Sequence, residues 1–217
     1  EYTPIKHYED MDVLYHDIAI AYQKAIRAFY DAGCRYLQLD DTSWGEFCDA
    51  NKRKAYKERG LDLDKIAKSY VDMINLALEE KPKDMTITMH ICRGNFRSTW
   101  FSSGGYEPVA EILFGHCKVD GFFLEYDSER SGDFSPLRFI KDQKVVLGLI
   151  TSKFAHLEDK EEVKKRIQEA EQYVKKEQLC LSPQCGFSST EEGNIMTEDE
   201  QWAKVKLVKE IAEEVWN

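Results

Sequence analysis

The segment MTITMHICRGNF, residues 85–96, carries the pattern that decides the fold. Its first six residues form a short apolar run with β-branched side chains, which is typical of a buried strand. The run ends in His90, Cys92 follows two residues later, and an Arg-Gly-Asn turn comes next. A buried strand that ends in an imidazole and a thiol predicts that its carboxyl end carries chemistry.

The chain repeats this arrangement of a short apolar strand followed by a helix. Strands are expected at residues 36–40, 85–90, 121–125, 144–150 and 179–182. Helices are expected at residues 10–31, 62–80, 106–116, 158–177 and 197–216, with a short helical piece at residues 135–142. The order is one helix and then five strand–helix units. Strands of nearly continuous apolar character predict a parallel sheet that is covered on both faces.

Two α/β folds fit this order, a doubly wound open sheet and a (β/α)8 TIM barrel. Polar and reactive residues collect where the predicted strands end, at Asp40 and Asp41, His90 and Cys92, Glu125 and Asp127, Thr151 to Lys153, and Cys185. A barrel places all its strand ends around one ring, whereas an open sheet binds ligands mainly at one crevice. We therefore expect a TIM barrel in which residues 1–217 are the C-terminal portion of a single catalytic domain. They would cover about its last five β/α units.

The bulk properties of the chain exclude several classes of protein. Hydrophobic residues make up 42% and charged residues 32%, as in ordinary globular proteins. No apolar run approaches the roughly 20 residues that span a bilayer, and no leader with a cleavage site is seen, so we expect a cytoplasmic protein without a membrane partner. The formal net charge of −10 argues against nucleic acid as a partner. Five strands cannot close an eight-stranded barrel, so about three further units are expected upstream or missing.

Four strand-end residues form a set that suits a metal ion: His90, Cys92, Glu125 and Cys185. Residues i and i+2 of an extended segment point to the same side, so His90 and Cys92 can face one ion. Two thiols, an imidazole and a carboxylate are a donor set that zinc accepts. Taken singly, His90 has the plainer interpretation of a hydrogen-bonded structural residue, and Cys92 that of a small buried side chain. The six cysteines form no CxxC pair and are expected to be reduced.

The segment LQLDDTSWGEF, after the first predicted strand, supplies a second group of candidates. Asp40 at a barrel mouth suits a substrate ammonium group. Asp41 and Thr42 have the structural alternative of capping a turn. Glu46 follows closely, and Trp44, also a substrate-binding candidate, either packs on a planar ligand or lines the wall.

Basic side chains follow several strand ends, at Arg93, Arg97, Arg130 and Lys153. Most surface arginines and lysines are simply solvated. In a chain with net negative charge, however, a cluster of them at the strand ends can hold a carboxylate or a phosphate. Of these residues, Arg93 is the expected substrate-binding residue. No P-loop, GxGxxG or GxSxG motif is present in the sequence.

Four segments, HICRGN, FFLEYDSERSGDFSPL, VVLGLITSK and LSPQCGFSS, resemble in this order the catalytic half of cobalamin-independent methionine synthase. The similarity is greatest to short bacterial relatives labelled methionine synthase II or 5-methyltetrahydropteroyltriglutamate–homocysteine methyltransferase-like. It extends from about Asp31 to the C-terminus. The resemblance implies a (β/α)8 barrel and a zinc-dependent enzyme that transfers a methyl group from methyltetrahydrofolate or a similar donor to homocysteine, giving methionine.

The resemblance also implies roles for single residues. The zinc ligands of the family correspond to His90, Cys92, Glu125 and Cys185. The aspartate that contacts the homocysteine amino group corresponds to Asp40, although the family's following Glu-Pro is replaced here by Asp41 and Thr42. The family's downstream glutamate near the substrates corresponds to Glu46.

One departure from the family pattern concerns the proton donor. The family places a histidine after its penultimate strand, but the corresponding place in GLITSKFAH falls on Ser152 or Lys153, with His156 nearby. We therefore take Glu125 and Lys153 as the two catalytic candidates. The folate-binding residues of the large enzymes lie mostly in upstream or different regions, so the methyl donor stays open, as does the oligomeric state.

Two other functions fit the same residues. One is a related zinc barrel that acts on a different thiol or carries out a decarboxylase-like reaction. The other is a non-catalytic barrel with a structural zinc ion or with thiols that sense oxidants. A structural site is closed by four ligands, whereas a catalytic site keeps an exchangeable position for a substrate.

Overall fold

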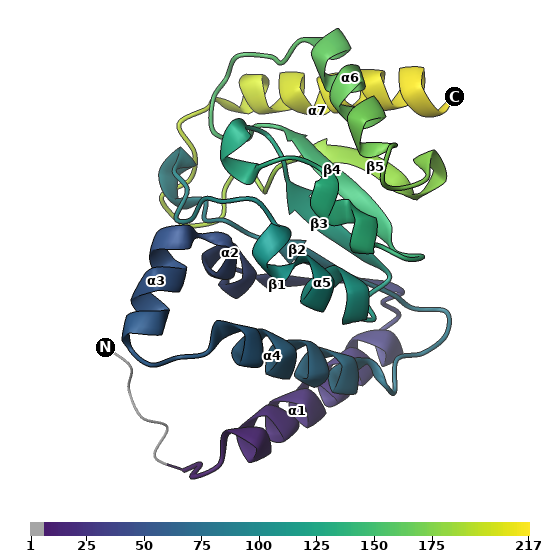
Figure 1. Cartoon of the computed structure of the whole chain (residues 1–217). Coiled ribbons are helices and arrows are strands. Elements are labelled where there is room, and N and C mark those ends of the chain that lie inside the picture. Colours follow the sequence, from purple (N-terminus) through teal and green to yellow (C-terminus); the bar gives the residue numbers. More distant parts are fainter. Residues whose placement is uncertain (1–6) are drawn as a thin grey trace.

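The computed structural model describes residues 7–217, so residues 1–6 of the expected domain lie outside the described residues. Its sheet has five parallel strands, β1 Tyr36–Asp41, β2 Thr86–Ile91, β3 Gly121–Glu125, β4 Lys144–Ile150 and β5 Leu179–Pro183. All five predicted strands are confirmed. The strand order along the sheet follows the chain, β1-β2-β3-β4-β5 (Figure 1). A doubly wound sheet reverses its order at a switch point, so this order excludes it and matches consecutive units of a barrel.

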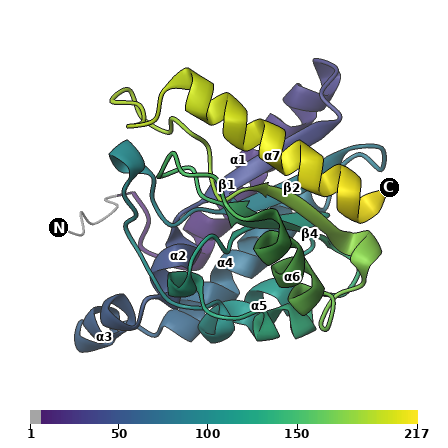
Figure 2. The same cartoon turned by 90° about the horizontal axis from the view of Figure 1, so that it is seen from above.

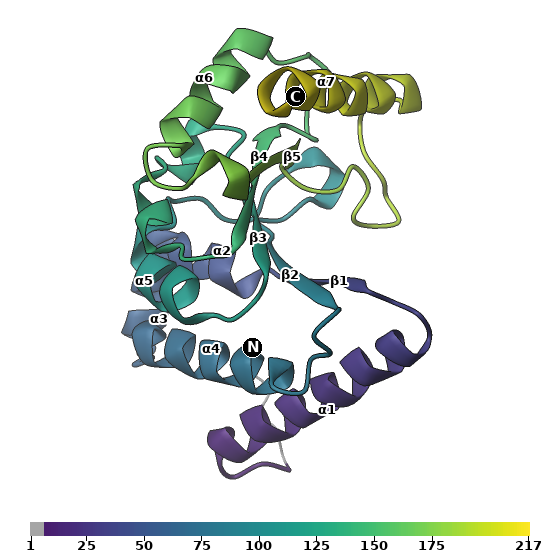
Figure 3. The same cartoon turned by 90° about the vertical axis from the view of Figure 1, so that its right-hand side faces the viewer.

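The helices form an arc along the sheet. The described chain contains α1 Met11–Asp31, α2 Ser43–Cys48, α3 Ala50–Glu58, α4 Leu63–Leu78, α5 Glu107–His116, α6 Lys160–Ala170 and α7 Glu198–Trp216. Short 3-10 turns lie in the connections, at η1 Phe96–Ser98, η2 Glu129–Ser131, η3 Ser135–Phe139 and η4 Lys176–Gln178. Helix α1 packs against α4, α4 against α5, and α6 against α7 (Figure 3). Seen from above, α6 and α7 lie side by side and α3 projects from the body (Figure 2).

Side-chain caps set the starts of the longer helices. The Asp62 carboxylate accepts hydrogen bonds from the backbone N–H groups of Asp64 and Lys65, so Asp62 opens α4. Thr197 and Glu200 form a reciprocal capping box at the start of α7. These signals are local in the sequence, which is why the predicted starts of both helices are confirmed.

The helix predicted at residues 158–177 is too long. In the structure α6 ends at Ala170, and the chain then turns to reach the start of β5. The charged residues beyond Ala170 favour a helix and carry no stop signal. The chain must nevertheless turn there to reach β5, and this tertiary constraint overrides their helix propensity.

The sequence does not predict α2 and α3. Helix α3 has no buried residue and begins at a cap formed by Asp49, so it lacks the apolar periodicity that indicates a helix. The turn expected just before α2 is present, because the Asp41 carboxylate accepts a hydrogen bond from the Ser43 backbone N–H at 2.8 Å. The Thr42 side chain makes no capping hydrogen bond.

The two faces of the sheet are covered unequally. Leu37 and Leu39 of β1 pack against the core, whereas Tyr36, Gln38 and Asp40 on the other face are exposed. Strands β2, β3 and β4 are buried along almost their whole length. The arc of helices covers only one face of the sheet (Figure 3), and residues of all five strands line a cavity on the other, so the expectation that both faces are covered is wrong for the described residues.

Two further properties concern the chain as a whole. Within residues 7–217, no helix has the length and apolar character needed to cross a bilayer. All six cysteines are free thiols. Two of them, Cys92 and Cys185, approach each other at the carboxyl end of the sheet.

Candidate metal centre

Four side chains meet at the carboxyl ends of β2 and β3. His90 and Glu125 belong to these strands, Cys92 follows β2 directly, and Cys185 lies in the loop after β5. The parallel pairing of β2 and β3 places His90, Cys92 and Glu125 side by side, and the loop after β5 brings Cys185 to them. One possible ligand atom from each residue lies within 4.8 Å of the others. The structure brings the four predicted ligands together, and their binding of a metal stays a prediction.

The spacing of the ligand atoms fits a tetrahedral ion. The Sγ atoms of Cys92 and Cys185 are 3.8 Å apart. His90 Nε2 is 3.9 Å from Glu125 Oε1. Zinc–sulfur bonds of about 2.3 Å at tetrahedral angles separate two sulfur ligands by about 3.8 Å. The thiol pair therefore has the separation that a shared zinc ion requires.

The His90 ring is oriented for ligation. Its Nδ1 atom lies 3.2 Å from the Phe123 carbonyl oxygen, which can accept a hydrogen bond from the ring N–H. Its Nε2 atom is buried and has no hydrogen-bond partner among the described residues. A buried polar atom without a partner costs about 1–3 kcal/mol, and metal-bound histidines commonly donate their other N–H to a carbonyl. The orphaned Nε2 atom therefore fits a metal ligand.

Glu125 is fully buried, and both of its carboxylate oxygens have donors. Oε1 accepts a hydrogen bond from the Arg93 backbone N–H at 2.7 Å, and Oε2 accepts one from Arg130 Nη2 at 2.9 Å. The Glu125 backbone N–H donates to the Tyr106 hydroxyl at 2.9 Å. Burial raises the pKa of Glu125, although the hydrogen bonds from Arg93 and Arg130 oppose this rise. These donors fix the carboxylate beside His90.

The contact between the two sulfur atoms shifts the pKa values of both thiols. Their hydrogen bond lowers the pKa of Cys185 and raises the pKa of Cys92, since a thiolate on one sulfur is stabilised by the proton on the other. The Gly94 backbone N–H also donates to Cys92 Sγ at 3.4 Å. Two sulfurs, a carboxylate and an imidazole nitrogen together form a donor set that suits zinc. The residues present therefore fit the ion that the sequence predicts.

Asp40 lies beside this cluster. It is the register partner of His90 in the β1–β2 pair, and its side chain is exposed. Partial burial of the carboxyl raises the pKa of Asp40, and the charge of His90 opposes the rise. The carboxylate is thus near the cluster and open to solvent, and its contact with a substrate ammonium stays a prediction.

Trp44 and Glu46 make their contacts elsewhere. Trp44 is fully buried and packs edge-on against Phe47 and Tyr70, with ring centroids 5.7 and 6.3 Å away. Glu46 accepts a hydrogen bond from the Tyr56 hydroxyl at 2.8 Å. These contacts lie in the layer formed by α2, α3 and α4, so Trp44 packs as part of the core, and neither residue joins the four-residue cluster.

Arg93 is fully buried as well. Its Nη1 atom donates to the Gly104 carbonyl at 2.6 Å, and its guanidinium lies 4.3 Å from the centroid of the Tyr106 ring. Contact between this guanidinium and a substrate would require the loop at Gly104 to move. In the structure as it stands, Arg93 supports the cluster through its backbone N–H, which binds Glu125.

Lys153 is buried within the loops that follow the strands. Its ammonium donates to the carbonyl oxygens of Gly94 and Thr99 at 3.0 and 2.8 Å, and to Asn95 Oδ1 at 3.0 Å. Burial lowers the pKa of Lys153. All three ammonium hydrogens are used in these contacts, which favours a positioning role over the predicted role in proton transfer.

Sequence reasoning misses three residues that organise the site: Tyr106, Asn95 and Asn194. Tyr106, the residue just before α5, binds the Glu125 backbone 19 residues away, a contact that no local pattern reveals. Asn95 donates hydrogen bonds to two residues of the loop after β5. The only signal in the sequence is its place in a Gly-Asn turn, where asparagine side chains commonly hydrogen-bond to the backbone. Asn194 lies in a loop where the sequence shows no chemistry-bearing pattern.

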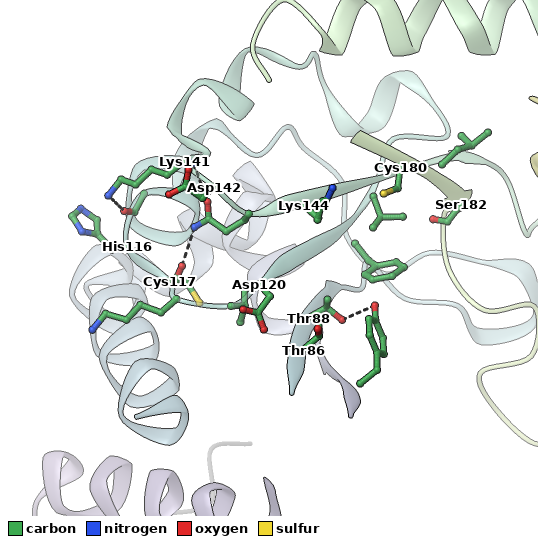
Figure 4. Close-up of a pocket in the computed structure, with 18 residues that line it drawn as sticks. Thr86, Thr88, His116, Cys117, Asp120, Lys141, Asp142, Lys144, Cys180 and Ser182 are labelled. Atoms are coloured by element: carbon green, nitrogen blue, oxygen red, sulfur yellow. Dashed lines mark hydrogen bonds between the residues drawn. The ribbon is translucent and has the colours of Figure 1, made fainter. Parts of the chain in front are cut away.

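A cavity of about 1040 Å³ lies on the exposed face of the sheet, toward the amino ends of the strands. Its lining includes Thr86, Thr88, Lys144, Cys180 and Ser182 (Figure 4). None of the four candidate ligands borders it. In a closed barrel this face is the packed interior, so the hollow belongs to an open barrel wall and not to a site at the carboxyl ends.

Comparison with known proteins identifies similar chains. Residues 5–214 match the family model described as "Cobalamin-independent synthase, Catalytic domain". The chain is 57% identical over 211 residues to "Uncharacterized protein YxjH" of Bacillus subtilis (strain 168), covering 96% of this chain and 56% of that protein. The chain thus spans a little over half the length of this relative.

Two solved structures share the fold. A putative vitamin-B12 independent methionine synthase from Listeria monocytogenes is 47% identical with a TM-score of 0.77, covering 100% of this chain and 59% of that one. A B12-independent methionine synthase from Shewanella sp. W3-18-1, in complex with selenomethionine, is 20% identical with a TM-score of 0.72, covering 96% and 56%. These similarities confirm the predicted α/β barrel, of which this chain covers a part.

Proposed function

Because the chain belongs to the cobalamin-independent methionine synthase family, we propose that it carries the zinc-binding part of a homocysteine methyltransferase. The enzyme transfers a methyl group from methyltetrahydrofolate or a similar donor to the thiol of homocysteine, giving methionine. The convergence of His90, Cys92, Glu125 and Cys185 within 4.8 Å is the observation that carries the proposal.

Residues 1–217 are, in this proposal, the C-terminal portion of one TIM-barrel catalytic domain. Among residues 7–217, β1 and β5 each pair with a single strand, and one face of β1 is exposed. The Bacillus and Listeria relatives are longer than this chain. Further β/α units that pair with β1 and β5 would cover the exposed face and fill its cavity.

A zinc ion bound by the cluster would ionise the homocysteine thiol near neutral pH and present it as a nucleophile. A bond then forms between the homocysteine sulfur and the methyl carbon while the bond from the methyl carbon to the donor breaks. The electron pair of the broken bond stays with the donor, which takes up a proton, and the thiol proton is released. The substrate sulfur would take the place of Glu125 or of a water, and Glu125 could give up its place because both of its oxygens keep hydrogen-bond donors.

Asp40 binds the substrate ammonium group in this proposal. Its exposed carboxylate lies in register with His90, so an amino acid held by its sulfur at the cluster can reach Asp40 with its amino group. The partners of the chain are then two small molecules, homocysteine and the methyl donor. We expect the reaction to take place in the cytoplasm, which fractionation of cells would check.

A metal analysis followed by a methyl-transfer assay tests the proposal. We expect about one zinc ion per chain, and methionine formation from homocysteine with one of several methyl donors. Cys92→Ala and Cys185→Ala should lose both zinc and activity. Cys117→Ala, which removes a buried thiol outside the cluster, should keep both. Zinc-free protein with full activity would overturn the proposal.

A structural zinc site is the second candidate, and one observation favours it. The four side chains already supply the four donors that close a tetrahedral site. A structural site predicts that homocysteine leaves the metal environment unchanged and that the protein unfolds when a chelator removes the ion. A catalytic site predicts a new zinc–sulfur contact of about 2.3 Å to homocysteine, seen by X-ray absorption.

A further inference from the structure

Two loops at the carboxyl ends of the strands, those after β2 and β4, are joined through one buried side chain. Lys153, in the loop after β4, is completely shielded from solvent. Its ammonium binds the loop after β2 at three oxygens, those of Gly94, Asn95 and Thr99. A buried ammonium needs several such acceptors to offset its lost hydration. The three hydrogen bonds therefore form only when the loop after β2 keeps its present conformation.

The part of the loop between these acceptors has an unusual backbone. Arg97 has φ of 44° and Ser98 has φ of 64°, so two consecutive residues other than glycine occupy the left-handed region. L-residues adopt this region at a cost, and such segments persist only where surrounding contacts determine them. Lys153 binds the loop on both sides of this segment, at Asn95 before it and at Thr99 after it.

The same loop contacts the Cys92 sulfur atom of the candidate metal centre and the loop that carries Cys185. The Gly94 backbone N–H donates to Cys92 Sγ at 3.4 Å. The Asn95 amide donates to the carbonyl oxygen of Gly186, the residue after Cys185, and to the Ser189 hydroxyl at 3.0 Å. Lys153 therefore orients the residue that connects the Cys92 loop to the Cys185 loop.

Asn194 closes the network from the loop after β5. Its amide donates to the Ser152 carbonyl at 2.8 Å, next to Lys153, and its Oδ1 atom accepts a hydrogen bond from the Ser98 hydroxyl at 2.9 Å. The loops after β2, β4 and β5 thus form one hydrogen-bonded layer over the site, with Lys153 as the charged group at its centre.

We propose that Lys153 is a positioning residue that sets the separation of Cys92 and Cys185, and so the affinity of the cluster for a thiol-binding divalent cation. The inference rests on the proposed metal centre and adds a residue that does not itself bind the metal. Lys153 acts through Asn95, which binds the Cys185 loop, and through the peptides beside Cys92. Groups that orient metal ligands in this way commonly change metal affinity about 10- to 100-fold when removed.

The test compares Lys153→Met with Lys204→Met. Lys204 is an equally buried lysine whose ammonium lies 2.9 and 3.0 Å from the two carboxylate oxygens of Glu158, so its loss removes a buried charge without touching the loop after β2. Zinc affinity is measured by competition with a chromophoric chelator. The thiolate-to-metal absorption of the Co²⁺-loaded proteins reports the geometry of the sulfur pair.

Lys153→Met should bind zinc at least about tenfold more weakly than the wild-type protein and shift the Co²⁺ spectrum. Lys204→Met should lose thermal stability and keep both metal readouts. Asn95→Ala removes the hydrogen bond to the Gly186 carbonyl and leaves Lys153 in place, and it should also weaken zinc binding. If Lys153→Met does not fold, Asn95→Ala alone tests the inference. Wild-type zinc affinity and spectrum in Asn95→Ala, or in a folded Lys153→Met, would overturn the inference. A wild-type protein that binds no zinc would instead overturn the proposed function.

Discussion

Arg130 binds Glu125 in a buried ion pair, with 2.9 Å between Nη2 and Oε2 and with the two side chains 9% and 0% exposed. The same nitrogen lies 2.7 Å from Oδ1 of Asp127. One guanidinium therefore compensates two buried carboxylates at the end of β3. Removal of one partner from such a pair leaves an uncompensated charge in the interior, which makes Arg130 the most sensitive support of the candidate ligand Glu125.

Arg130→Met should lower the free energy of unfolding by about 3 kcal/mol or more at neutral pH, because Glu125 and Asp127 lose their shared cation. Arg138→Met is the control, since Arg138 pairs with Glu107 at the surface and should contribute at most about 1 kcal/mol. Urea denaturation followed by circular dichroism measures both. Equal losses in the two variants would contradict the assignment of a buried pair.

Arg130→Met should also change how zinc binding depends on pH. Burial already raises the pKa of Glu125, and Arg130 opposes that rise, so its removal raises this pKa further. Protons and the metal compete for the carboxylate, so zinc affinity in the variant should begin to fall at a higher pH than in the wild-type protein. Zinc titrations from about pH 5 to about pH 8 test this, and parallel profiles would argue against Glu125 as a ligand.

Asp49→Ala should destabilise the protein by about 1–2 kcal/mol at neutral pH, since Asp49 caps α3 and its Oδ2 atom also accepts a hydrogen bond from the Ser103 backbone N–H at 3.0 Å. Burial opposes ionisation, but hydrogen bonds from the Ser103, Lys52 and Asn51 backbone lower the pKa of Asp49. A lowered folded-state pKa contributes stability above the unfolded-state value, and this contribution is lost as pH falls through the folded-state pKa.

The difference in stability between wild type and Asp49→Ala should therefore narrow as pH falls below about 4. Denaturation measured from about pH 7 to about pH 3 follows this difference directly. A difference that stays constant over the whole range would show that the Asp49 charge is not involved.

Gly148→Ala should destabilise the sheet by about 1–3 kcal/mol. A Cβ atom at Gly148 would lie 2.6 Å from Gln184 Cα and 2.7 Å from the Leu124 carbonyl oxygen, so backbone on both sides would have to move. Gly115→Ala in α5 meets nothing within 4 Å and should leave stability unchanged or slightly higher. Thermal unfolding compares the two variants. A Gly148→Ala variant as stable as the wild-type protein would contradict the close approach of the backbone at Gln184 and Leu124 to Gly148.

Removal of zinc by a chelator should lower the melting temperature and leave the secondary structure intact. If the cluster binds zinc as proposed, the fold should not depend on the ion, because the core is built from the strands and helices whereas Cys92 and Cys185 lie in loops. The ion stabilises the native state only by mass action, and the shift should grow with the zinc concentration that is restored. Loss of far-ultraviolet circular dichroism on chelation would favour the structural alternative.

The strands and the four candidate ligands are readable from the sequence because both depend on local pattern. Continuous apolar runs predict both ends of β3 and β4 correctly. Reactive side chains that follow the strands identify the carboxyl ends of the sheet as the place of the site. The spacing of His90 and Cys92 follows from strand geometry alone. Cys185 follows β5, three strands from β2, so its convergence with this pair depends also on the curvature of the sheet and on the course of the loop after β5.

The directions of Trp44, Arg93 and Lys153 could not be read in the same way. Trp44 lies on α2, a helix that the sequence does not predict, so its burial against Tyr70 could not be inferred. Arg93 and Lys153 lie in loops whose course depends on distant partners, at Gly104 and at Thr99. A position just after a strand end indicates that a residue lies near the site. Only the tertiary structure shows whether its side chain faces the site.

The sequential strand order has a consequence for synthesis on the ribosome. Each strand from β2 to β5 pairs with the strand that emerged just before it, so the sheet can grow by one β/α unit at a time as the chain is extended. No strand has to wait for a neighbour that is translated much later. Cys185 is the last of the four candidate ligands to emerge, so the four can meet only when nearly all of the described strands have been synthesised.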